Sequence, residues 1–126
     1  MPLARLDVYV AVSDLDRATE FYTRFFETDP VVRTPTYSGF DLGGALFGLF
    51  DANAYPPDHP VVRGNSTVAN IFVTDVDAEH ERVASLGPRA IAPIFTLATG
   101  YRGFVFADPD GNVLELYEEA AAGAPC

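Results

Sequence analysis

The stretch Val10-Ala-Val-Ser-Asp-Leu-Asp16 returns 61 positions later as Ile71-Phe-Val-Thr-Asp-Val-Asp77. In both copies the apolar end of a strand is followed by a hydroxyl residue and then by Asp-apolar-Asp. Similarity at a fixed offset is the mark of a structural repeat. The sequence of 126 residues therefore predicts two similar halves.

Each copy predicts a strand that runs into a helix. Residues 6–12 alternate between apolar and other side chains, which is the period of a strand. We expect Ser13 to cap a helix over residues 15–26, with Asp16 as the partner in a capping-box variant. The core face of this helix has the i, i+3, i+4, i+7 spacing and consists of Ala18, Phe21, Tyr22 and Phe25.

The second half repeats this arrangement. Thr74 is the predicted cap of its helix, Val76, Val83 and Leu86 form the predicted apolar stripe, and Gly87 is the predicted stop. Further strands are expected near residues 30–33, 36–41 and 45–50, and near 89–95, 103–107 and 113–117. The predicted fold class is therefore α+β, one domain of two tandem βαβββ modules at residues 5–51 and 67–118. Residues 52–66 are the expected linker, and residues 119–126 are a tail that we expect to fray.

The composition excludes several kinds of partner. The net charge is −10, and all eight basic residues are arginine. A chain this acidic lacks the basic surface that nucleic acids and anionic membranes attract. No apolar run approaches the ~20 residues that span a bilayer, and the N-terminus lacks the apolar core of a signal peptide, so we expect a cytoplasmic protein. Cys126, the single cysteine, has no partner within the chain for a disulfide or a thiolate metal site.

One helix covers only one face of a sheet, so the other face must meet a ligand, the other half or a second chain. This predicts a small-molecule cleft. By strand alternation the cleft-facing residues are Asp7, Tyr9, Leu46, Gly48, Phe50, Val68, Asn70, Phe72, Val113, Glu115 and Tyr117. Arg102 is a further ligand-binding candidate, although the alternation does not decide which face of its strand enters the cleft.

These features together resemble the vicinal oxygen chelate superfamily. The resemblance rests on the two βαβββ units, on residues 13–22 after the first strand, on residues 73–77 midway, and on Asp108-Pro-Asp-Gly-Asn112 near the end. The superfamily contains glyoxalases, bleomycin-resistance proteins, extradiol dioxygenases and fosfomycin-resistance enzymes. The resemblance extends from Leu6 to Glu118, and it implies a mixed sheet around a cleft and a homodimer.

Catalytic members of this superfamily hold a divalent metal with His, Glu or Gln side chains. The resemblance places the four ligand positions at Asp7, Gly48, Val68 and Glu115. Gly48 has no side chain and Val68 has no lone pair, whereas a catalytic site needs about three protein ligands. We therefore expect no metal cofactor; a divalent metal held by Asp7 and Glu115, with help from Asn70, is the alternative.

Asp7 and Glu115 are also the candidate catalytic residues. Together they could form a proton donor–acceptor pair or an anionic clamp for a cationic ligand, or one of them could pair with Arg102. Neither histidine offers a replacement ligand: His59 lies in the linker, and His80 is expected on a solvated helix face.

Two functions remain from different classes. We favour a metal-independent binding protein of the bleomycin-resistance type that sequesters an aromatic or cationic compound. The alternative is a lyase or dioxygenase of the glyoxalase type with a degenerate metal site. A metal-free enzyme that uses Asp7 and Glu115 is a third reading.

Overall fold

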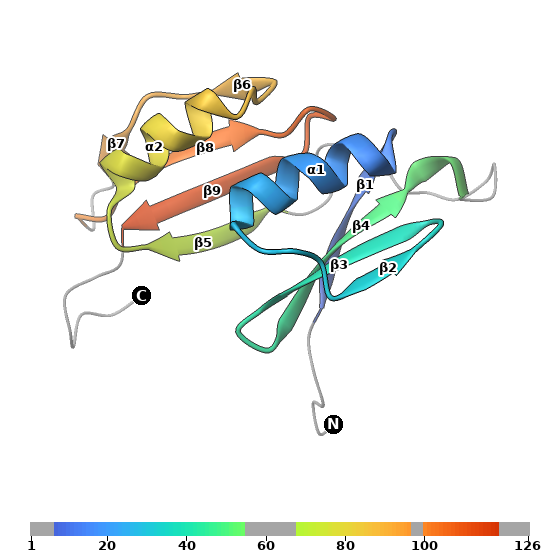
Figure 1. Ribbon diagram of the computed structural model, residues 1–126. Helices are drawn as coiled ribbons and strands as arrows, with labels where there is room; N and C mark the ends of the chain where they lie inside the picture. Colours follow the sequence, from blue (N-terminus) through green and yellow to red (C-terminus); the bar gives the residue numbers. More distant parts are fainter. Residues whose placement is uncertain (1–6, 55–67, 97–99, 119–126) are drawn as a thin grey trace. The chain divides into compact units, whose positions relative to one another are not determined.

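The computed structural model describes residues 7–54, 68–96 and 100–118 (Figure 1). Leu6, the predicted linker from residue 55 onward with His59, and the predicted tail lie outside the described residues. The chain divides into two compact units, Met1–Ser66 and Thr67–Cys126.

In the described part of the chain, each unit has one α-helix and one sheet. Unit 1 contains, in chain order, β1 (Val8–Val12), α1 (Leu15–Phe26), β2 (Val32–Thr34), β3 (Tyr37–Leu42), β4 (Ala45–Asp51) and the short 3₁₀ helix η1 (Ala52–Ala54). Unit 2 contains β5 (Ala69–Val73), α2 (Val76–Ser85), β6 (Ala90–Ile91), β7 (Phe95–Thr96), β8 (Arg102–Ala107) and β9 (Val113–Glu118). The mixed α+β class predicted from the sequence is confirmed.

The two sheets have the same strand order. In unit 1 the order is β1-β4-β3-β2, and in unit 2 it is β5-β9-β8-β6 with β7 also paired to β8 (Figure 1). The first strand of each unit runs parallel to the last, and the other pairs are antiparallel. The strand expected over residues 89–95 is divided into β6 and β7. Pro93 lies between them, and a proline has no N–H to donate to a sheet ladder.

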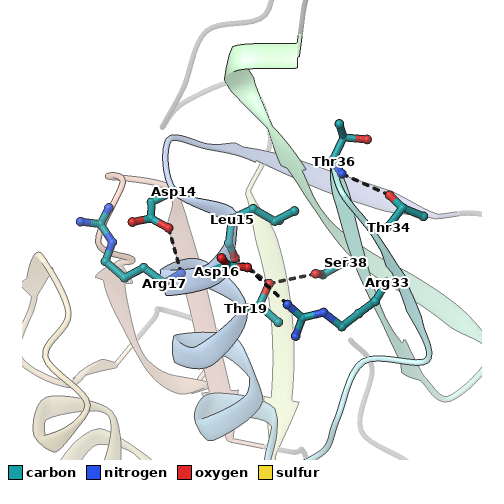
Figure 2. A network of polar contacts seen from close by, with 9 residues as sticks. All are labelled: Asp14, Leu15, Asp16, Arg17, Thr19, Arg33, Thr34, Thr36 and Ser38. Atoms are coloured by element: carbon teal, nitrogen blue, oxygen red, sulfur yellow. Dashed lines mark hydrogen bonds and ion pairs between the residues drawn. The ribbon is translucent and has the colours of Figure 1, made fainter.

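The core of unit 1 lies between α1 and one face of its sheet. Ala18, Phe21, Tyr22 and Phe25 are all buried, as their spacing predicts. Tyr22 packs against Phe47 of β4 with ring centroids 5.3 Å apart. A buried hydrogen bond of 2.8 Å between the Thr19 and Ser38 hydroxyls also ties α1 to β3 (Figure 2). Ring packing and this polar contact together fix the helix on the sheet.

The caps of the two helices are one residue later than the sequence analysis placed them. The Asp14 carboxylate accepts from the Arg17 N–H at 3.0 Å (Figure 2), and the Asp75 carboxylate accepts from the Ala78 N–H at 3.1 Å. Both caps have extended backbones. Their carbonyls accept the first intrahelical bonds, which defines the cap position. The prediction that Ser13 and Thr74 are the caps is therefore wrong.

Helix α2 covers the sheet of unit 2 with a narrower apolar face. Val76 and Val83 are fully buried, whereas Leu86 is only partly buried. Gly87 follows the helix with φ +78°, the left-handed conformation expected of the predicted stop. The prediction of a solvated His80 is wrong: its ring lies edge-on to Phe104 at 4.8 Å, and its Nε2 is 2.9 Å from the Ala92 carbonyl oxygen.

Candidate functional site

The face of each sheet that does not pack on its own helix carries the candidate site residues, and we call it the helix-free face. In unit 1, Tyr9 of β1 is in register with Gly48 of β4, which is in register with Gly39 of β3. In unit 2, Asn70 of β5 is in register with Glu115 of β9. Neighbouring residues in register point to the same side of a sheet. The helix-free faces therefore hold most of the residues that alternation assigned to the cleft.

A tyrosine lies flat on the helix-free face of unit 1. A β-carbon built at Gly39 would be 3.0 Å from Tyr37 Cε2, and one built at Gly48 would be 2.6 Å from Tyr37 Cζ. Because the two glycines have no side chains, they leave a depression in the surface of the sheet, and the phenol of Tyr37 fills it. Any side chain at Gly48 would have to displace this ring.

Three more residues of this face, Tyr9, Phe50 and Asp7, are aromatic or already hydrogen-bonded. Tyr9 is 42% exposed and lies 5.8 Å from Phe50, centroid to centroid. The Asp7 carboxylate, just before β1, accepts a hydrogen bond of 3.0 Å from the Leu46 backbone N–H. Part of the hydrogen-bonding capacity of Asp7 is therefore used to hold the start of β1 against β4.

The helix-free face of unit 2 has a carboxylate at the matching position. The Tyr117 hydroxyl donates to Glu115 Oε1 at 2.6 Å. This hydrogen bond raises the pKa of Tyr117 above its ordinary value of 10.0, with burial and the charge of Glu115 as lesser causes. The tyrosine is therefore a neutral donor that holds the carboxylate in one orientation.

Aromatic rings surround this pair. Phe72 of β5 is 50% exposed and lies 6.0 Å from Tyr117 and 6.3 Å from Tyr101, centroid to centroid. Phe95 of β7 lies 6.1 Å from Tyr117 on the other side, edge to face. We call Phe72, Phe95, Tyr101 and Tyr117 the aromatic cluster. Apolar rings around a few oriented polar groups are the usual lining of a small-molecule site.

The structure places Arg102 on the opposite face. Its guanidinium donates to both oxygens of Asp77 in α2, at 3.0 and 2.9 Å, and lies 3.6 Å from Glu118. The hydrogen bond from Arg102 lowers the pKa of Asp77. Because Gly103 is the residue in register with Tyr117, Arg102 points to the helix side and does not join Glu115. We leave it out of the candidate site.

The residues at the family's ligand positions do not fit a metal. Gly48 and Val68 supply no donor atom, and the phenol of Tyr37 occupies the space above Gly48. Within the described residues, no group of three or more His, Cys, Asp and Glu side chains is arranged to hold a metal ion. Asp7 and Glu115 belong to different units, and their predicted proximity stays a prediction, as does the cleft that both units would line.

Three rings near these faces, Tyr37, Phe95 and Tyr101, are not among the site residues predicted from the sequence. Strand pairing supplies the missing information: Gly39, two residues from Tyr37, is in register with Gly48, and Phe95 is in register with Gly103. An aromatic residue near glycines on a paired strand is the pattern that could have identified them.

Comparison with known proteins agrees with this architecture. Residues 5–116 match the family model of the Glyoxalase/Bleomycin resistance protein/Dioxygenase superfamily. The chain is 31% identical over 113 residues, covering 85% of each protein, to the phenazine antibiotic resistance protein EhpR of Enterobacter agglomerans.

Solved structures show the same fold. A glyoxalase-related enzyme from Fulvimarina pelagi matches with a TM-score of 0.79 and 22% identity, over 98% of this chain and 96% of that one. TioX from Micromonospora sp. ML1 matches with a TM-score of 0.74 and 22% identity, over 93% of this chain and 99% of that one. None of the helices in the described residues is long and apolar enough to cross a membrane.

Proposed function

Because the chain belongs to the Glyoxalase/Bleomycin resistance protein/Dioxygenase superfamily, we propose that it binds a planar aromatic small molecule without a metal and acts as a resistance protein by sequestering it. The relative EhpR is a phenazine antibiotic resistance protein. Phenazines are flat tricyclic aromatics, and they are the first ligand class to test. Cytoplasmic residence and a homodimer are part of the same proposal.

The main support for this proposal is the kind of residue found at the positions that correspond to the metal ligands of the superfamily. A phenol covers Gly48 in unit 1, and a phenol hydrogen-bonds Glu115 in unit 2. Two positions that hold metal ligands in catalytic relatives are thus associated with aromatic rings in this chain. Rings favour flat apolar ligands, since offset stacking and edge-to-face contacts add about 0.5–1.5 kcal/mol per pair to area burial.

The exposed rings supply the binding surface. Tyr9 and Phe72 are 42% and 50% exposed, each on the helix-free face of its unit. Phe72 belongs to a contiguous group with Tyr101 and Tyr117, and contiguous exposed apolar patches are typical of interaction sites. A flat ligand that covers such a ring removes apolar area from water, at about 25 cal/mol per Å².

The test is a titration of phenazine into the protein, with and without EDTA. The chain has six tyrosines and no tryptophan, so quenching of tyrosine fluorescence reports on binding, and Tyr9, Tyr37 and Tyr117 of the helix-free faces contribute to that signal. We expect saturable binding with a Kd of about 1–10 μM that EDTA leaves unchanged. Phe72→Ala should weaken binding about tenfold, whereas Val31→Ala, an exposed apolar residue outside the strands, is the matched control.

The outcomes separate the two classes of function. Affinity that EDTA abolishes would favour the metal-dependent lyase or dioxygenase. Absence of saturation by phenazine and by other planar tricyclic compounds would refute binding of this class. Equal effects of Phe72→Ala and Val31→Ala would show that the helix-free face of unit 2 is not the binding surface.

A further inference from the structure

The carboxylate of Glu115 has an unusual setting on the helix-free face of unit 2. It is half-buried and lies beside the aromatic cluster. Among the described strand residues of this unit it is the one charged side chain on that face, because Arg102 and Glu118 pair with each other on the helix side. Among those described strand residues, no arginine on this face offsets its negative charge.

Tyr117 orients this carboxylate and leaves it with capacity to accept. The phenol donates to Oε1 at 2.6 Å, and of the described residues it is the one that hydrogen-bonds Glu115. A carboxylate offers about four acceptor sites, so Oε2 and the second lone pair of Oε1 remain for another donor. The neighbouring positions in register, Asn70 and Val105, add no positive charge.

A negative charge among rings favours one class of flat ligand. A cationic aromatic gains both from the carboxylate and from the negative faces of the rings, whereas an anionic aromatic is repelled by both. Desolvation by the bound ligand strengthens each of these interactions. A ligand with a protonated ring nitrogen or an amine N–H also supplies the donor that the Glu115 carboxylate can accept.

We infer that Glu115, oriented by Tyr117, makes this protein selective for planar nitrogen heteroaromatics in their protonated or N–H-donating form over neutral or carboxylated analogues. This inference rests on the proposed function, since it specifies the ligand class of the same site. Glu115 contacts the ligand, and Tyr117 is a positioning residue.

The test uses neutral red, an aminophenazine dye whose ring nitrogen titrates near neutral pH and whose two forms differ in colour. Absorbance gives the ratio of cationic to neutral dye at each pH. The ratio is measured for the dye alone and for the dye with excess protein, both at 0.15 M salt. We expect the bound dye to favour the cation by about tenfold more than the free dye does. Glu115→Gln should remove most of this shift, and Tyr117→Phe should reduce it to an intermediate value.

Glu81→Gln is the matched control. Glu81 is an exposed residue of α2, so this change removes the same charge from the opposite side of the sheet. Glu81→Gln should change the cation-to-neutral ratio of the bound dye by less than about twofold relative to the wild-type protein, because exposed charges are screened by salt. Circular dichroism of each variant shows whether the variant is folded before its dye spectrum is compared.

The results distinguish the inference from the proposed function. If neutral red and phenazine bind but the cation ratio stays that of the free dye, the selectivity is wrong and the proposed function stands. If the shift persists in Glu115→Gln, or falls equally in Glu81→Gln, the general charge of the protein causes it and the role of Glu115 is refuted. If neither compound binds, the proposed function itself fails.

Discussion

The helix-free faces of the two units share one backbone plan and differ in chemistry. Gly48 pairs with Tyr9, and Glu115 pairs with Asn70, which lies 61 positions after Tyr9. Gly48 and Glu115 are therefore equivalent positions. At this position unit 1 has a glycine, and the ring of Tyr37 lies over it. Unit 2 has a carboxylate, which accepts a hydrogen bond from Tyr117.

This difference shows where the repeat has diverged. The helices, their aspartate caps and the strand order are alike in both units. The change that bears on binding lies at side chains of the helix-free faces, where it alters what the sheet can bind without altering the strand order. At this position the helix-free face of unit 1 is therefore apolar, and that of unit 2 is charged.

The largest expected effect concerns the glycine beneath the unit 2 tyrosine. A β-carbon at Gly103 would lie 2.6 Å from the Leu116 carbonyl oxygen and 2.6 Å from Tyr117 Cδ1. Since a backbone oxygen within a sheet cannot move aside, we expect Gly103→Ala to lower the free energy of unfolding by about 3 kcal/mol. Urea denaturation measures this, and adding Tyr117→Ala should recover only a minor part of it, because the overlap with the Leu116 carbonyl oxygen remains. A loss below about 1 kcal/mol would show that the sheet adjusts.

The equivalent test in unit 1 should behave differently. The three atoms nearest to a β-carbon built at Gly48 all belong to the side chain of Tyr37, and a ring can rotate away. We expect Gly48→Ala to cost about 2 kcal/mol alone. A double-mutant cycle with Tyr37→Ala should recover about 1 kcal/mol of that loss. Strict additivity of the two changes would contradict the idea that Tyr37 fills the place of the missing side chain.

Loss of the helix cap should reduce the free energy of unfolding by a similar amount in both units. Asp14→Ala and Asp75→Ala each remove a carboxylate that accepts a backbone N–H in the first turn, and each should cost about 1 kcal/mol. Ser13→Ala and Thr74→Ala are the controls and should change stability by less than about 0.5 kcal/mol. A larger effect of the hydroxyl residues would reverse the assignment of the caps.

The caps illustrate how far the sequence could be interpreted. The repeat, the helix faces and the alternation of strands predict the fold, because each depends on a period of side chains along the chain. A hydroxyl residue next to an aspartate offers two possible caps, however, and the choice depends on the backbone angles of Asp14 and Asp75. Sequence alone does not contain those angles.

The site was less predictable than the fold for a related reason. Alternation assigned Tyr9, Phe50, Phe72 and Glu115 to one side of the sheets, but it left the face of Arg102 open. The pairing of Gly103 with Tyr117 decides this, and pairing between distant strands cannot be obtained from local pattern. The position of Tyr37 over two glycines likewise depends on the register of β3 and β4.

The smallest expected effect tests the hydrogen bond that distinguishes unit 2. The Tyr117 hydroxyl donates to Glu115, which raises the pKa of Tyr117 above 10.0 in the folded chain. Tyr117→Phe removes this bond, and we expect a loss of about 0.5–1 kcal/mol at pH 8. Urea denaturation of both proteins at pH 8 and at about pH 11 measures the loss at each pH.

The pH dependence follows from the direction of this pKa. Below about pH 10 the phenol is protonated in both states, so the hydrogen bond contributes fully. As pH rises past the unfolded value, the unfolded chain loses this proton first, and the contribution is lost progressively up to the raised folded pKa. The unchanged protein should therefore lose more stability than Tyr117→Phe between pH 8 and pH 11, the other five tyrosines being common to both. Parallel losses in the two proteins would mean that Tyr117 does not donate to Glu115 in solution, and the contrast between the two helix-free faces would then rest on the charge of Glu115 alone.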